Sequence, residues 1–220
     1  MNTEPCVLGS GQEQVYAGWI YAFGLYQPRW QIGRHLNSAW SQAVILAKRR
    51  TESAIKRFGQ IIAAHLEAEL LDDQEYVITH VPAEEDHELY LFLEFGRCAT
   101  ELLADAIYSN LKGKVRIALA SLLVQVKPKE HKQRQCLSDR QRRENVNGIY
   151  ATANGTQIAG RIVILVDDVL TSGATMAECA RVLRLAGARS VMGIALARTE
   201  RMKLPQYAAA FHQRPGGDAA

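Results

Sequence analysis

Apolar and polar positions along this chain follow two different periods, which predict strands and helices in alternation. Residues 162–166 are five consecutive Leu or β-branched residues, a run typical of a strand buried on both faces of a parallel sheet. Shorter β-rich runs at 76–81 and 190–197, and one within 115–126, predict further strands. Strands that alternate with helices indicate an α/β fold with a mostly parallel sheet flanked by helices.

Apolar residues at helical spacing occupy the segments between these strands. Residues 39–71 predict two helices with a break near Arg50, and 96–111 and 175–186 predict one helix each. The segment 15–26 is rich in aromatic residues and predicts a strand pair. Its 12 residues are too few to span a bilayer.

The composition is that of an ordinary globular protein and excludes a disordered chain. Hydrophobic residues make up 48% and charged residues 22% of the 220 positions. This length suits one large domain or a domain with a smaller addition. We expect a strand pair and helices at 1–72 as a hood-like addition, a core at 73–206, and a disordered tail at 207–220.

The cysteines and the N-terminus favour a cytoplasmic protein. Cys6, Cys98, Cys136 and Cys179 are scattered, and no pair has the spacing of metal ligands or of a disulfide framework. The first residues lack the basic and apolar regions of a signal peptide. We therefore expect a reducing compartment, no membrane partner and no metal bound directly by the chain.

Charge is distributed unevenly along the chain. Residues 127–143 carry a strong excess of Lys and Arg, whereas 84–94 contain five acids and no Lys or Arg. The first segment suits an anionic partner and the second repels one. The polar, Gln-rich stretch 127–147 predicts a mobile loop, although an ordinary solvated surface would have the same composition.

The most informative segment for chemistry is 163–175. The predicted strand ends in Asp167 and Asp168, a turn of small and hydroxyl residues follows, and a helix then begins, with Thr175 and Glu178 at the spacing of a capping box. In such a strand–turn–helix unit, free backbone N–H groups form a site for phosphate.

Within this unit, each residue type has a predicted role. The phosphate would lie in the turn formed by Thr171, Ser172, Gly173, Ala174 and Thr175, where Gly173 lets the backbone approach and hydroxyls donate hydrogen bonds. Carboxylates repel phosphate but accept hydrogen bonds from sugar hydroxyls, so the ligand indicated is a ribose that carries a phosphate. The competing interpretation is a solvated turn without a ligand.

The sequence of 163–175, VILVDDVLTSGAT, resembles the motif that binds 5-phosphoribosyl 1-pyrophosphate (PRPP) in type I phosphoribosyltransferases. Residues 137–148 are similar to a basic segment of the ComF-type competence family, and 43–66, with Lys48, resemble one of its helices more weakly. The resemblance spans about residues 40–200. It implies a type I phosphoribosyltransferase-like fold and a transfer of the phosphoribosyl group to a nitrogen acceptor.

The resemblance also implies roles for individual residues. Asp167 and Asp168 would be catalytic and hold the ribose hydroxyls, 171–175 would hold the 5-phosphate, and Mg²⁺ would bind through PRPP. The loop after Val81 and Pro82 would meet the pyrophosphate. A lid would be formed by Lys127, Lys129, Lys132, Arg134, Arg142 and Asn145.

Two departures from the family leave a second function open. The N-terminus has only Cys6 in place of a four-cysteine zinc module, and acidic residues at 84–88 replace an arginine-rich pyrophosphate loop. The first hypothesis is a phosphoribosyltransferase. Such a protein could form a homodimer. The alternative is a non-catalytic module that senses a phosphoribosyl ligand or binds single-stranded DNA.

Overall fold

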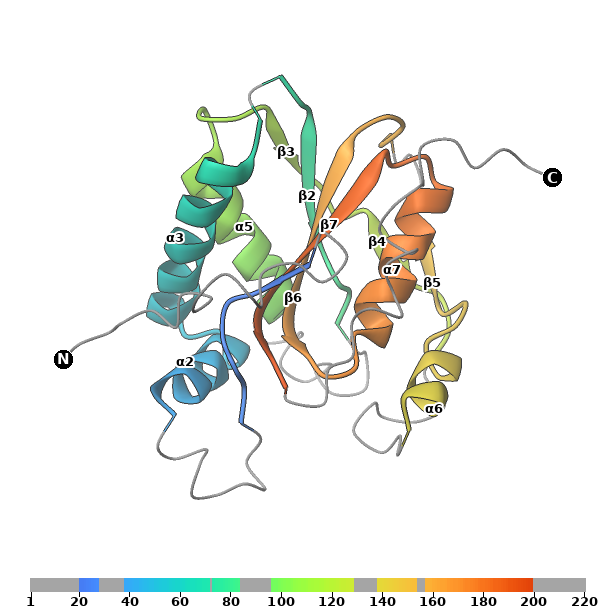
Figure 1. Ribbon diagram of the computed structural model, residues 1–220, viewed down its shortest axis with the longest axis horizontal. Helices are drawn as coiled ribbons and strands as arrows, with labels where there is room; N and C mark the ends of the chain where they lie inside the picture. Colours follow the sequence, from blue (N-terminus) through green and yellow to red (C-terminus); the bar gives the residue numbers. More distant parts are fainter. Residues whose placement is uncertain are drawn as a thin grey trace.

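The computed structural model describes residues 20–27, 38–71, 73–83, 96–128, 138–153 and 157–199. Strands and helices alternate along most of this length (Figure 1). In chain order the elements are β1 (Ile20–Ala22), α2 (Ala39–Lys48), α3 (Glu52–Glu69), β2 (Tyr76–His80), α5 (Ala99–Leu111), β3 (Ile117–Leu119), β4 (Leu123–Gln125), α6 (Asp139–Glu144), β5 (Tyr150–Thr152), β6 (Ile162–Leu170), α7 (Ala174–Leu185) and β7 (Ser190–Arg198).

The main sheet has five strands in the order β1-β7-β6-β2-β3, and every neighbouring pair is parallel. Strands β4 and β5 form a separate antiparallel pair. The predicted α/β fold with a mostly parallel sheet is therefore confirmed. Of the strand pair predicted at 15–26, the described residues 20–26 contain strand β1, which joins the main sheet beside β7, and 15–19 lie outside the described residues.

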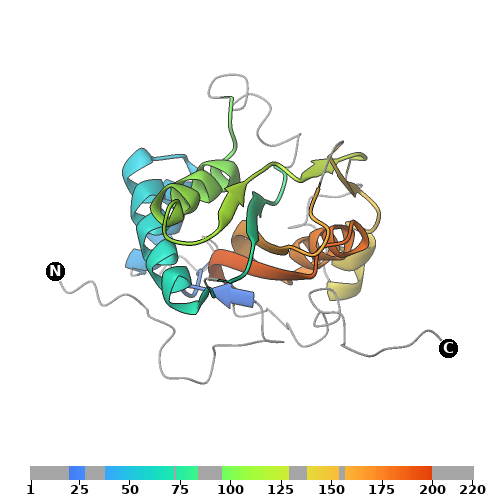
Figure 2. The same ribbon diagram turned by 90° about the horizontal axis from the view of Figure 1, so that it is seen from above.

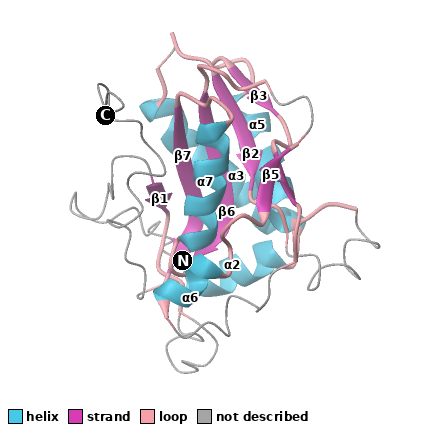
Figure 3. Ribbon diagram, turned by 90° about the vertical axis from the view of Figure 1, so that its right-hand side faces the viewer, coloured by secondary structure: helices cyan, strands magenta, loops and turns pink. Residues whose placement is uncertain are grey.

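Strand β6 has helices on both of its faces, as its unbroken apolar run predicts. Val163 and Leu165 belong to a buried cluster that includes the apolar side of α7. Ile164 and Val166 belong to a second buried cluster, formed with α3 and α5. Figures 2 and 3 show the resulting layers, with α7 on one side of the sheet and α3 and α5 on the other.

The helix break predicted near Arg50 is confirmed, because α2 ends at Lys48 and Arg50 has a positive φ of 60°. Helix α3 then packs closely on α5. A Cβ atom at Gly59 would lie 2.7 Å from the Cβ of Ala106, so only glycine allows this approach. The described part of 1–72 thus contributes strand β1 and the two helices α2 and α3 to the buried core, and its hood-like role remains a prediction.

The stretch predicted as a mobile loop, 127–147, contains the short helix α6. Its N-cap Ser138 accepts a hydrogen bond from the Gln141 N–H, and the Gln141 side chain accepts one from the Ser138 N–H. This capping box satisfies N–H groups that a helix start leaves free. The basic composition of this stretch favoured a loop, and the Ser138–Gln141 capping spacing was overlooked. Residues 129–137 lie outside the described residues.

The capping box predicted from Thr175 and Glu178 is wrong. Helix α7 has Gly173 as its N-cap, with φ 80° and no side-chain cap. Glu178 is buried; it accepts the N–H of Gly148 at 2.8 Å and pairs with Arg181 at 2.7 Å. Burial of Glu178 raises its pKa, but the bonds from Arg181 and Gly148 outweigh this and hold the pKa below the usual 4.5.

We expect Glu178→Gln to destabilise the protein by about 1–3 kcal/mol at pH 7, because it weakens two charge-assisted hydrogen bonds. A carboxyl whose pKa is lower in the folded state stabilises the fold above its unfolded pKa, and that stability disappears as pH falls through the folded pKa. Urea denaturation should therefore show a difference from wild type at pH 7 that shrinks below about pH 4.5. The control Glu144→Gln breaks an exposed pair with Arg140 and should leave stability nearly unchanged, because water and salt screen exposed ion pairs. Equal costs for both variants would contradict this account of Glu178.

Among the described helices, none is both long enough and apolar enough to cross a membrane.

Candidate functional site

The chain reverses its direction across the sheet between β2 and β6. From β2 it passes through α5 to β3 at one edge, and from β6 it passes through α7 to β7 on the opposite side. The helices after these two neighbouring strands consequently lie on opposite faces of the sheet. In open α/β sheets, ligands bind outside the carboxyl ends of strands at such a switch point.

Asp167 and Asp168 lie at this point. Strand β2 pairs with β6 only as far as His80 opposite Val166, whereas β6 continues beside β7 to Leu170. The two carboxylates therefore lie in an extension of β6 that lacks β2 on one side, and β6 continues to Leu170 rather than ending at Asp167 and Asp168 as the sequence predicted. Both side chains are partly exposed, so their oxygens remain accessible to a ligand.

Hydrogen bonds and an ion pair fix these carboxylates. Asp167 Oδ1 accepts the N–H of Asp168 at 2.8 Å, and Asp168 Oδ1 accepts the N–H of Val169. The other oxygen of Asp168, Oδ2, lies 2.7 Å from Lys48 Nζ. Burial alone would lower the pKa of Lys48, but Asp168 and, less strongly, Asp167 raise it above 10.5, so the amine is protonated at neutral pH.

Helix α2 delivers Lys48 to the site because its start is anchored to the sheet. Ser38 caps the helix by accepting the N–H of Ser41 at 3.1 Å. The Trp40 indole donates to the carbonyl of Leu196 in β7 at 3.0 Å and covers Gly24, where a Cβ atom would collide with the ring. Figure 1 shows α2 at the lower edge of the molecule, toward which β6 and β7 run.

The turn between β6 and α7 joins this edge directly. Ser172 is buried, and its Oγ accepts the N–H of Ala174 at 3.4 Å. Gly173 adopts a left-handed conformation that residues with a side chain rarely take. The N–H groups at the start of the 12-residue helix α7 have no partner within the helix and favour an anion.

Two side chains from distant segments hold the first residue of the turn. Thr199 donates its hydroxyl to the carbonyl of Thr171 at 3.2 Å. Arg142, in α6, donates to Thr171 Oγ1 at 3.0 Å. A guanidinium therefore lies beside a turn that already suits an anion, and an anionic ligand there would gain a further cation.

The other predicted site residues are placed as follows. The N–H of Val81 donates to the carbonyl of Val166, which keeps the start of the loop after β2 beside β6, and Pro82 follows it. Asn145 is buried after α6, and Lys127 is exposed after β4. Lys129, Lys132, Arg134 and the acids at 84–88 lie outside the described residues.

Sequence reasoning did not assign a site role to Lys48 or Thr199. Lys48 is 120 positions from Asp168, so no local pattern connects them. A lysine at the end of a helix usually complements the helix dipole, and this ordinary explanation conceals its contact with the carboxylate.

Comparisons with known proteins agree with this geometry. The family model described as phosphoribosyl transferase domain matches residues 103–212, which is 110 of the 220 positions. A search of curated proteins finds no match.

Three solved structures illustrate what this chain resembles at low sequence identity. A hypoxanthine phosphoribosyltransferase from Staphylococcus aureus is 12% identical, with a TM-score of 0.44, and the match covers 70% of this chain and 68% of that chain. A phosphoribosylpyrophosphate synthetase from Mycobacterium smegmatis is 20% identical, with a TM-score of 0.39 and coverage of 72% and 38%. An adenine phosphoribosyl transferase from Trypanosoma brucei, in complex with AMP, pyrophosphate and ribose-5-phosphate, is 13% identical, with a TM-score of 0.39 and coverage of 78% and 71%.

The family match includes β6, both carboxylates, the anion-binding turn and α7. It also agrees with the parallel sheet and its switch point. The chain therefore belongs to the family of proteins that carry a phosphoribosyl transferase domain.

Proposed function

We propose that the protein binds PRPP at the carboxyl ends of β2 and β6 and transfers its phosphoribosyl group to a nitrogen acceptor. The observation that carries the proposal is the placement of two hydrogen-bonded carboxylates directly before an anion-binding turn. Asp167 and Asp168 accept hydrogen bonds from the ribose hydroxyls. Residues 171–175 bind the 5-phosphate through backbone N–H groups and hydroxyls.

The reaction is a displacement at C1 of the ribose. The lone pair of the acceptor nitrogen forms the new bond to C1, and the C1–O bond breaks with its electron pair leaving on pyrophosphate. Positive charge develops on the ribose ring as the bonds exchange, and the neighbouring carboxylates stabilise it. Binding at both ends of the sugar orients C1 toward the acceptor. The chain needs no covalent intermediate of its own.

The residues at this edge fit Mg²⁺ that is held mainly by the substrate. Asp167 and Asp168 offer hard oxygen atoms, but Lys48 already neutralises one carboxylate, so the chain provides a weak cation site by itself. Bound through PRPP, Mg²⁺ would neutralise charge on the leaving pyrophosphate. Asp167 and Asp168 would contact it through water or through the ribose oxygens.

Lys48 contributes a fixed cation beside a highly anionic ligand. We expect Lys48→Met to weaken PRPP binding about tenfold, an effect that added salt reduces because the interaction is electrostatic. Lys56→Met is the matched control, since Lys56 forms an exposed pair with Glu52 on α3. Calorimetric titration at two salt concentrations measures both effects. Equal affinity in wild type and Lys48→Met would show that the ion pair with Asp168 serves only the fold.

Pyrophosphate release tests the proposed reaction. Wild-type protein, PRPP and Mg²⁺ would be incubated with purine bases, pyrimidine bases and ammonia as separate nitrogen acceptors. We expect release above the background hydrolysis of PRPP with at least one acceptor class, and none from Asp167→Asn/Asp168→Asn. Saturating PRPP binding without release under all these conditions would contradict catalysis and leave ligand sensing as the function.

The similarity of 137–148 to ComF-type proteins adds a more specific proposal, a role in DNA uptake or processing in the cytoplasm. Its support is the hydrogen bond of 3.0 Å from Arg142 to Thr171 Oγ1 in the anion-binding turn. Binding of single-stranded DNA and formation of a homodimer remain hypotheses, and no observation on the described residues favours either.

A further inference from the structure

Three side chains that can bind a metal meet at the carboxyl end of β2. His80 is the last residue of β2, Cys98 is the N-cap of α5, and Glu101 lies in the first turn of α5. One potential ligand atom from each lies within 4.8 Å of the other two. Cys98 is buried, with 5% of its surface exposed, and Glu101 remains partly accessible.

A hydrogen-bonded contact in the first turn of α5 positions Cys98. Thr100 Oγ1 donates its single proton to the carbonyl of Val81 at 2.9 Å. Cys98 Sγ lies 3.2 Å from the same oxygen. The sulfur is therefore held beside the end of β2, close to His80.

The other two ligands are also compatible with a cation. His80 offers an imidazole nitrogen, the commonest side-chain ligand of metals in proteins. Arg97 binds Glu101 Oε1 at 3.0 Å and also Asp105 at 3.3 Å. Asp105 can retain Arg97 when Glu101 turns toward a metal.

We propose that His80, Cys98 and Glu101 form a binding site for Zn²⁺ or a similar borderline-soft divalent ion. The mixed set of nitrogen, sulfur and oxygen ligands suits Zn²⁺, whereas a thiolate does not suit Mg²⁺. Ligand atoms around tetrahedral Zn²⁺ lie about 3.3–3.8 Å apart, given bonds of about 2.0–2.3 Å, so small side-chain rotations complete the site. A water molecule takes the fourth position. The spacing of the four cysteines gave no sign of it, because only one of the three ligands is a cysteine.

The proposed ion would join the end of β2 to the start of α5. His80 is the last residue of β2 and Cys98 directly precedes α5, so a shared ion fixes these two element ends to each other. His80 also pairs with Val166, the neighbour of Asp167. The ion therefore stabilises the strand end next to the proposed ribose site, although its binding does not depend on PRPP.

Titration with Zn²⁺ and Co²⁺ tests the site. The background is Cys6→Ser/Cys136→Ser, which removes the two thiols outside the described residues. We expect one Zn²⁺ per chain by calorimetry, a rise in melting temperature with Zn²⁺, and a thiolate-to-Co²⁺ charge-transfer band in the near ultraviolet. His80→Gln and Glu101→Gln should each weaken Zn²⁺ binding at least about tenfold, and Cys98→Ser should abolish the band.

Two controls separate this site from nonspecific metal binding. Cys179→Ala changes a buried thiol on α7 and His65→Gln changes an imidazole on α3, and both should leave the band and the stoichiometry unchanged. If Cys98→Ser does not fold, the partly exposed Glu101→Gln decides the question. No Zn²⁺ binding by the background protein, or unchanged binding by His80→Gln and Glu101→Gln, would overturn the proposal.

Discussion

The Asp167→Asn/Asp168→Asn protein should fold normally and lose PRPP binding by about 100-fold or more. A hydrogen bond from a hydroxyl to a charged acceptor contributes about 1.5–3 kcal/mol, so two such bonds to the ribose account for this loss. The fold survives because an asparagine Oδ1 still accepts the backbone N–H groups of Asp168 and Val169 that the carboxylates accept now. Calorimetric titration measures the affinity for PRPP, and circular dichroism shows whether the variant is folded.

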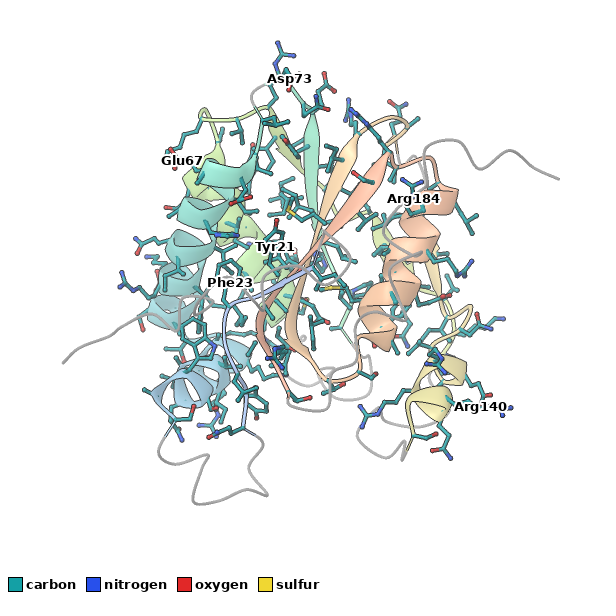
Figure 4. All side chains as sticks on the ribbon, viewed as in Figure 1. Tyr21, Phe23, Glu67, Asp73, Arg140 and Arg184 are labelled. Carbon is teal, nitrogen blue, oxygen red and sulfur yellow. The ribbon has the colours of Figure 1, made fainter. Side chains whose placement is uncertain are left out.

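The matched control for this variant is Asp73→Asn/Glu75→Gln. It makes the same change in net charge at the opposite end of β2, where Figure 4 shows Asp73 at the upper edge of the molecule. PRPP affinity should be unchanged in the control. An equal loss in both double variants would mean that only the overall charge matters and that the ribose assignment is wrong.

Replacing Gly173 with Val should reduce PRPP affinity at least about 100-fold and lower stability by about 1–3 kcal/mol. Gly173 has φ 80°, a region that is costly for a β-branched residue. The backbone would move out of this conformation, and its N–H groups would lose their alignment toward the 5-phosphate. Titration with PRPP and with ribose 5-phosphate should show the same loss, because both ligands carry this phosphate.

Gly160→Val distinguishes strain from ligand binding. Gly160 has a similar φ of 77°, and a Cβ atom there meets nothing within 4 Å. It lies just before β6, at the far end of the strand from the site. This control should lose similar stability but retain PRPP affinity. A folded Gly173→Val protein with wild-type affinity would contradict the backbone cradle.

Local patterns predicted most of the fold and the central part of the site. The run at 162–166 is buried between two helical layers, as its β-branched composition indicates, and the hydroxyl-rich turn after it begins a helix at the sheet edge. These predictions succeed because strand periodicity and turn chemistry depend on neighbouring residues. The family match then supports the chemistry that the same residues suggest.

Contacts between distant segments could not be predicted in this way. Lys48 meets Asp168 only because Trp40 anchors α2 to β7. Glu178 has the spacing of a capping residue, yet tertiary packing turns it toward Gly148. In both cases the arrangement of elements around the sheet sets the partner, so the residues next to Lys48 and Glu178 in the sequence do not identify it.

Calorimetric titration of the wild-type protein with PRPP, in the presence of Mg²⁺ and at low salt, tests the central claim most directly. We predict saturable binding of one PRPP per chain, with competition by ribose 5-phosphate and an affinity at least about 100-fold lower for Asp167→Asn/Asp168→Asn. Absence of PRPP binding at millimolar ligand by a folded wild-type protein would contradict the account, as would equal binding by the double variant.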